Sequence, residues 1–142
     1  MTDVPASRRR TILVVDDEPE ALGLFKRILS TEDAEILTAP TGAEALKIAR
    51  GTRLDLVILD VKLPDVSGTE VLRRLRKIDD SVPIIMVTSY GSPESVRAAM
   101  ELGAFDYLTK PFETQEVRRA AREALRIRAR RAVAAEAPRD RR

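Results

Sequence analysis

Carboxylates follow two apolar runs of this sequence. Asp16 and Asp17 come directly after residues 11–15, and Asp60 ends the run 54–60. Short runs rich in Leu, Ile and Val are typical of strands buried on both faces of a parallel sheet. Ligands bind at the carboxyl edge of such sheets, so these acids could bind a cation or act as nucleophiles there. Taken alone, an acid after a strand more often only caps or solvates a loop.

Two further polar residues end or follow predicted strands. Thr88 ends the run 83–88, and Lys110 follows the run 105–109. In a parallel sheet all carboxyl ends lie on one side, so three carboxylates, a hydroxyl and an ammonium group would meet there. Two negative charges about 5 Å apart repel by roughly 3 kcal/mol at an effective dielectric constant near 20. Such a cluster therefore calls for a cation.

The composition limits which cation and which chemistry are possible. The chain has neither Cys nor His, which excludes thiolate and imidazole groups as metal ligands, nucleophiles or bases. Oxygen ligands remain, and Mg²⁺ suits a few carboxylates plus water. Each residue has a plainer explanation, such as Asp17 capping a helix or Lys110 being a solvated loop residue. Their joint placement at the ends of four strands favours a functional site.

The elements that would position these residues alternate along the chain. Apolar positions at helical spacing follow each apolar run, and capping pairs open two of the helices: Thr41 with Glu44, and Ser67 with Glu70. Helical crossovers between buried strands predict an α/β fold, a single parallel sheet with helices on both faces. The predicted strands are 11–15, 35–39, 54–60, 83–88 and 105–109, and the last helix is predicted from about 113 to about 135.

Length and charge indicate the organisation of the chain. Its 142 residues fit one domain, and the formal net charge is +2. We expect a flexible N-terminus over 1–9, the main domain over 10–127, and a basic helical extension or linker over 128–142 that frays at its end. This extension lacks aromatic residues for stacking, and acids such as Glu136 dilute its charge, so direct nucleic-acid binding is not expected. No stretch reaches transmembrane length, and we expect a cytoplasmic protein.

These motifs resemble those of a known family. Asp16-Asp17, Asp60 within Leu-Asp-Val-Lys-Leu-Pro-Asp, Thr88-Ser89 and Lys110-Pro111 are similar to the receiver (CheY-like) domain of two-component response regulators. The resemblance covers about residues 10–127, and residues 88–112 look most like receivers of enhancer-dependent (NtrC-type) transcription activators. It implies a flavodoxin-like (βα)5 fold with a five-stranded parallel sheet in the order 2-1-3-4-5.

The resemblance also implies roles for the residues at the sheet edge. Asp60 would accept a phosphoryl group from a phosphohistidine of a sensor histidine kinase or phosphotransfer protein. Mg²⁺ (or Mn²⁺) would be held by Asp17, Asp60 and the backbone carbonyl of Lys62, with Asp16 acting through a water molecule. Lys110 would pair with Asp60 and then with the phosphoryl oxygens. The peptide bond between Lys110 and the following proline is expected to be cis.

The resemblance also implies residues that change conformation on phosphorylation and residues that set the rate of hydrolysis. Thr88 would turn its hydroxyl toward the phosphoryl group, and Tyr107 would move inward behind it. This would change the surface formed by the fourth helix, fifth strand and fifth helix, which could also form a homodimer. Lys62 and Tyr90 occupy positions that tune hydrolysis in the family, and their shielding predicts slow autodephosphorylation. Both side chains could equally face solvent only.

The predicted function is a switch operated by phosphorylation, and not an enzyme that acts on a separate metabolite. Two other functions remain as alternatives. One is an aspartate-nucleophile phosphohydrolase of the haloacid-dehalogenase type. That chemistry usually needs a second Asp two residues after the nucleophile, where this chain has Lys62. The other is a pseudo-receiver that binds partners without phosphorylation, which the complete set of site residues argues against.

Overall fold

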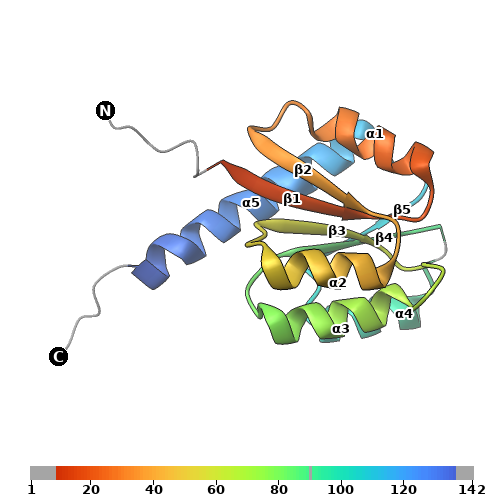
Figure 1. The fold of residues 1–142 in the computed structure, drawn as a ribbon. Coiled ribbons are helices and arrows are strands. Elements are labelled where there is room, and N and C mark those ends of the chain that lie inside the picture. The colour runs from red at the N-terminus through yellow and green to blue at the C-terminus, as the bar shows by residue number, and fades with distance from the viewer. Residues whose placement is uncertain (1–8, 90, 137–142) are drawn as a thin grey trace.

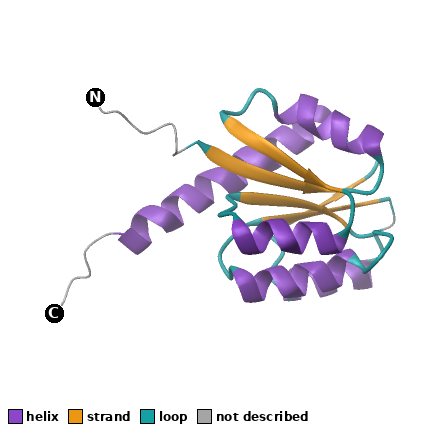
Figure 2. Ribbon diagram, in the orientation of Figure 1, coloured by secondary structure: helices purple, strands orange, loops and turns teal. Residues whose placement is uncertain are grey.

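The structure is a computed structural model that describes residues 9–89 and 91–136, with side chains to residue 131. Strands and helices alternate along the chain (Figures 1 and 2). The elements are β1 (Arg10–Val15), α1 (Pro19–Leu29), β2 (Ala34–Ala39), α2 (Gly42–Gly51), β3 (Leu56–Asp60), α3 (Gly68–Ile78), β4 (Ile84–Thr88), α4 (Pro93–Glu101), β5 (Asp106–Thr109) and α5 (Thr114–Glu136).

The five strands form one parallel sheet in the order β2-β1-β3-β4-β5, which confirms the predicted fold class and strand order. Helices α1 and α5 cover one face of the sheet, and α2, α3 and α4 cover the other (Figure 1). Every residue of β3 and β4 is buried, as expected for central strands with helices on both sides. These two strands therefore carry Asp60 and Thr88 on a rigid base.

Two hydrophobic cores lie on opposite faces of the sheet. Phe25 of α1 and Leu125 of α5 belong to the first core, together with strand residues such as Ile58. Leu46 of α2 and Leu72 of α3 belong to the second core. Neighbouring residues along a strand point to opposite faces, so each central strand contributes to both cores. Packing on both faces therefore fixes the positions of the strand ends relative to one another.

Each predicted capping pair forms one of its two possible hydrogen bonds, the one from the backbone N–H of the glutamate to the capping hydroxyl. The N–H of Glu44 donates to the Thr41 hydroxyl, and the N–H of Glu70 donates to Ser67, each at 3.1 Å. The carboxylate of Glu70 instead contacts arginines one turn later in α3. The predicted strand and helix bounds agree with the observed ones to within one or two residues.

Helix α5 is the longest element, and it extends beyond the sheet (Figure 1). The sequence predicted a basic helical extension or linker from residue 128 onward. Helix α5 continues to Glu136, and Arg128 within it is not a solvated residue: it is only 6% exposed and hydrogen-bonds to residues before β3 and β4. The apolar face of α5 continues at helical spacing past Leu125, and Arg128 lies on this face. None of the helices in the described part of the chain is both long and apolar enough to span a membrane.

Candidate functional site

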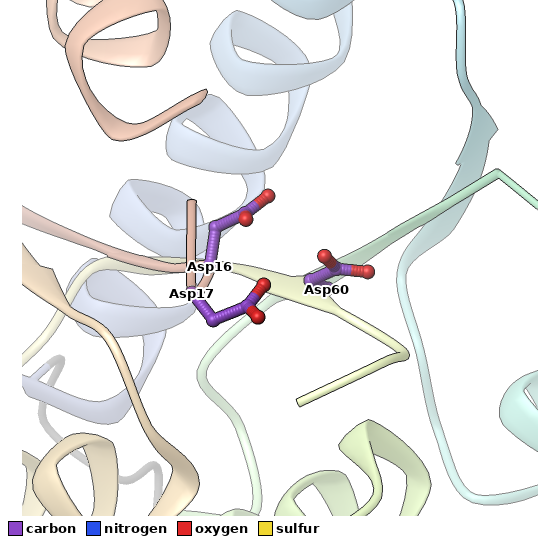
Figure 3. Close-up of side chains that lie close together, drawn as sticks. All are labelled: Asp16, Asp17 and Asp60. Carbon is purple, nitrogen blue, oxygen red and sulfur yellow. The ribbon is translucent and has the colours of Figure 1, made fainter. Parts of the chain in front are cut away.

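Three carboxylates meet where β1 and β3 end (Figure 3). Asp16 and Asp17 directly follow β1, and Asp60 is the last residue of β3. One carboxylate oxygen from each lies within 4.8 Å of the other two. Asp16 and Asp60 are buried, at 1% and 7% exposure, whereas Asp17 is exposed. The structure therefore brings together the three acids that the sequence placed at this edge.

Lys110 lies between the two buried acids. Its Nζ donates to Asp16 Oδ2 at 3.0 Å and to Asp60 Oδ2 at 3.5 Å, so the contact with Asp16 is the shorter one. Burial acts to lower the pKa of Lys110, but the hydrogen bond to Asp16 and the charge of Asp60 outweigh it, and the pKa lies above its ordinary value. Lys110 therefore stays charged at neutral pH. The Lys110-Pro111 peptide bond is cis, as predicted.

Asp60 is the acid whose protonation is most affected by this environment. Burial raises its pKa above the ordinary value, and the neighbouring charge of Asp16 raises it further. A hydrogen bond from the backbone N–H of Lys62, at 3.1 Å, and the charge of Lys110 oppose this effect only in part. A buried carboxylate beside another one is unfavourable in its charged form, and a cation at this edge would relieve that cost.

The loop after β3 folds back tightly over Asp60. The N–H of Gly68 donates to the Val61 carbonyl at 2.7 Å. A Cβ at position 68 would overlap the Asp60 carbonyl oxygen and lie 2.6 Å from Val61 Cα, so only glycine fits there. This close approach keeps residues 61–67 beside the carboxylate cluster. This role of Gly68 was not predicted from the sequence.

A cavity of about 380 Å³ opens at the cluster, and its wall combines acids, a hydroxyl and an ammonium group. Asp17 and Asp60 line one part, and the loop residue Lys62 lines another. Thr88, which is 3% exposed at the end of β4, and Lys110 complete the polar wall. The cavity thus contains the predicted phosphoacceptor, hydroxyl and ammonium groups together.

Tyr107 of β5 lies next to this site rather than in its wall. It is half-buried, and its hydroxyl is 3.1 Å from the Ser95 hydroxyl of α4. A Cβ at Gly91 would lie 3.3 Å from the Tyr107 ring and 3.9 Å from Thr88 Cγ2, so Gly91 lies beside both of these predicted switch residues. Tyr90, the second predicted tuning position, lies outside the described residues.

The donor set suits a hard divalent cation. One oxygen from each of three carboxylates lies within 4.8 Å of the other two, and the loop that carries the Lys62 carbonyl borders the same cavity. With no Cys or His in the chain, oxygen atoms are the available ligands, which fits Mg²⁺ or Mn²⁺. Asp17 is exposed and could bind an incoming ion, whereas Asp16 has one oxygen on Lys110 and the other on the N–H of Glu18. The role of Asp16 through a water molecule stays a prediction.

Comparison with known proteins points in the same direction. A sequence model described as the response regulator receiver domain matches residues 12–122. The chain is 36% identical over 114 residues to sporulation initiation phosphotransferase F of Bacillus subtilis (strain 168), covering 80% of this chain and 92% of that protein. It is 42% identical over 107 residues to the probable transcriptional regulatory protein TcrX of Mycobacterium tuberculosis (strain ATCC 25618 / H37Rv), covering 75% of this chain and 46% of that protein.

Solved structures resemble the whole domain. A CheY-like response regulator receiver domain protein from Methanospirillum hungatei JF-1 has a TM-score of 0.83 and 32% identity, covering 87% of this chain and 98% of that one. The chain spans about half the length of TcrX and of other transcriptional regulatory proteins that it matches. The chain therefore belongs to the response regulator receiver family, whose members act in phosphorylation-dependent signal transduction.

Proposed function

We propose that Asp60 accepts a phosphoryl group from a phosphohistidine of a sensor histidine kinase or a phosphotransfer protein. The observation that carries this proposal is the position of the Asp60 carboxylate, which lines the cavity beside two other acids with Lys110 Nζ 3.5 Å away. The similarity to a phosphotransferase over 92% of that protein supports the same chemistry. The chain would catalyse only its own phosphorylation and dephosphorylation, at a site in the cytoplasm.

The transfer needs alignment and charge neutralisation more than a base. A carboxylate oxygen of Asp60 forms a bond to phosphorus, and the phosphorus–nitrogen bond to the donor imidazole breaks, with its electron pair leaving on the ring. The Lys62 amide holds Asp60 Oδ1, which orients the carboxylate. Lys110 neutralises charge on the incoming oxygens. A divalent cation held by Asp17, Asp60 and the Lys62 carbonyl, with Asp16 through water, would supply further neutralisation.

The phosphoryl group would then change the surface formed by α4, β5 and α5. Thr88 lines the cavity and can donate its hydroxyl to a phosphoryl oxygen. Movement of Thr88 would open space beside Gly91 for the Tyr107 ring, which would exchange its contact with Ser95 for a position behind Thr88. Tyr107 contacts α4 through Ser95, so this exchange would change that surface and could be recognised by a partner, including a second copy of the chain.

The decisive experiment is phosphorylation by a small acyl phosphate with Mg²⁺, followed by mass spectrometry. We expect one phosphoryl adduct on the wild-type protein and none on Asp60→Ala. Asp55→Ala is the control, because Asp55 lies at the opposite end of β3 and bonds to the Thr11 N–H, and its adduct should persist. An unmodified wild-type protein would instead favour a pseudo-receiver. An adduct of full yield on Asp60→Ala would refute the assignment of Asp60.

The phosphorylated protein is expected to lose its phosphoryl group slowly. Lys62 lies on the cavity wall two residues after Asp60, where a long cationic side chain can shield the acyl phosphate from water. We expect a lifetime well above that of chemotaxis-type receivers in Mg²⁺, measured by decay of the radiolabelled protein. Lys62→Ala should shorten this lifetime, and Lys77→Ala, on the exposed side of α3, should leave it unchanged. Decay of the wild-type phosphoprotein within seconds would contradict this prediction.

A further inference from the structure

The first amides of helix α2 are satisfied by a residue from a distant loop. The N–H of Gly42 donates to Asp65 Oδ1 and the N–H of Ala43 donates to Asp65 Oδ2, both at 2.9 Å. Thr41 accepts the N–H of Glu44, and the helical ladder starts at the next residue. Amides in the first turn of a helix need such partners from outside the helix. Asp65 therefore binds the end of α2 with both of its oxygens.

Packing reinforces this contact between α2 and the loop after β3. A Cβ at Gly42 would overlap the side chain of Val66 and lie 2.8 Å from Val71 Cγ2. A glycine at this position thus lets the loop and the start of α3 lie directly on the end of α2. The positive end of the α2 dipole also favours a carboxylate at this place. The hydrogen bonds lower the pKa of Asp65, so the carboxylate stays charged over the neutral range.

The same loop borders the phosphoacceptor. It begins at Asp60, where the Lys62 N–H donates to the Asp60 carboxylate, and it closes where the Gly68 N–H donates to the Val61 carbonyl. Its first half, residues 61–64, lines the cavity. Asp65 directly follows this half and connects it to a helix that does not otherwise contribute to the cavity wall. The position of the loop therefore depends on two fixed ends and one side-chain contact to α2.

We propose that Asp65 is a positioning residue for the phosphoacceptor site, because its two bonds to α2 hold the loop that presents the Lys62 carbonyl to the divalent cation. This inference rests on the proposed function, in which that carbonyl is a ligand. Asp65 itself is exposed and outside the cavity, so it acts through the loop and not on the phosphoryl group. Residues that orient a ligand commonly change metal affinity by tenfold or more when removed.

Titration of the metal into the unphosphorylated protein tests this role. We expect Asp65→Ala to weaken Mg²⁺ binding about tenfold, measured by calorimetry and by the shifts of the Val61 and Lys62 amide signals in NMR spectra. Asp65→Asn keeps one acceptor oxygen and should give an intermediate affinity. Amide exchange at Gly42 and Ala43 should accelerate in Asp65→Ala without metal, which reports loss of the contact itself.

Thr41→Ala is the matched control, because it removes a cap from the same end of α2 without releasing the loop. Its Mg²⁺ affinity should stay within about twofold of wild type even where its thermal stability falls as much as that of Asp65→Ala. The inference is overturned if Asp65→Ala binds Mg²⁺ as wild type does, or if Thr41→Ala weakens binding equally. If the wild-type protein does not bind Mg²⁺, the proposed cation site is refuted together with the role of Asp65. If the wild-type protein binds Mg²⁺ and Asp65→Ala binds it equally well, only the role of Asp65 is refuted.

Discussion

Asp60→Asn is expected to raise the free energy of unfolding at pH 7 by about 1 to 2 kcal/mol without divalent cations, while it abolishes phosphorylation. Asp60 is 7% exposed, and its carboxylate lies within 4.8 Å of two others. Lys110 is closer to Asp16 than to Asp60 and offsets the repulsion only in part. A neutral amide of the same shape removes one charge from the cluster and keeps an oxygen for the Lys62 N–H.

The extra stability of Asp60→Asn over the wild-type protein should increase with pH. The pKa of Asp60 in the folded protein lies above its ordinary value of 3.8, chiefly because of burial. Between pH 3.8 and the raised pKa of folded Asp60, the folded state binds more protons than the unfolded chain. The stability of the wild-type protein therefore falls as the pH rises through this range. The Asn variant does not titrate at this position. Its advantage should be absent below pH 3.8 and complete above the raised pKa.

Chemical denaturation of both proteins at several pH values, in the presence of a chelator, measures this difference. Asp80→Asn serves as the control because Asp80 is exposed and lies outside the cluster, and its stability should change little at any pH. Saturating Mg²⁺ should stabilise wild type more than Asp60→Asn, because binding to the folded state alone adds stability. A loss of stability in Asp60→Asn at pH 7, or a gain of constant size down to pH 3, would contradict this account of the site.

The sequence predicted the elements well because their signals are local. Caps such as Thr41 and Ser67 lie three residues from the N–H that they accept, and apolar spacing shows which face of a helix is buried. The strand order was taken from the family resemblance, because the alternation of strands and helices does not determine which edge each new strand joins. The acids of the site were also predictable, since parallel strands end on one side.

The contacts that adjust the site could not be predicted in this way, because their partners are far apart in the sequence. Lys110 contacts Asp16 more closely than Asp60 across 94 residues, whereas the resemblance implied a pair with Asp60. Asp65 binds α2 amides 22 and 23 residues away. One signal was available for Arg128, which lies three residues after Leu125 on the apolar face of α5. A charged residue on such a face indicates a buried partner.

Arg128 connects α5 to the end of the sheet opposite Asp60. Its Nη2 donates to the Leu54 carbonyl at 2.9 Å and to Asp79 Oδ2 at 2.7 Å, and Nη1 donates to the Ser81 hydroxyl at 2.7 Å. These partners precede β3 and β4, the strands that carry Asp60 and Thr88 at their other ends. The chain past residue 127 is thus part of the packed domain, at least as far as this contact.

Replacement of Arg128 by Ala is expected to lower the free energy of unfolding by about 2 to 3 kcal/mol, because it removes a buried side chain and leaves the Leu54 carbonyl and the partly exposed Asp79 without this donor. Arg128→Lys keeps the charge but cannot reach three acceptors, so its loss should be intermediate. Arg126→Ala is the control on the same helix. Its side chain is 58% exposed and pairs with Glu123 one turn earlier, so its loss should be below about 0.5 kcal/mol.

The pH dependence distinguishes loss of the ion pair from loss of packing alone. Burial acts to raise the pKa of Asp79, but hydrogen bonds from the Ser81 amide and from Arg128 outweigh it, and the pKa lies below 3.8. Asp79 therefore stabilises the fold above its unfolded pKa, and this contribution is lost as the pH falls through the folded one. In Arg128→Ala the difference from wild type should shrink in acid, because wild type loses more. A difference of equal size at pH 3 and pH 7 would mean that Arg128 acts through packing of its side chain and not through its charge.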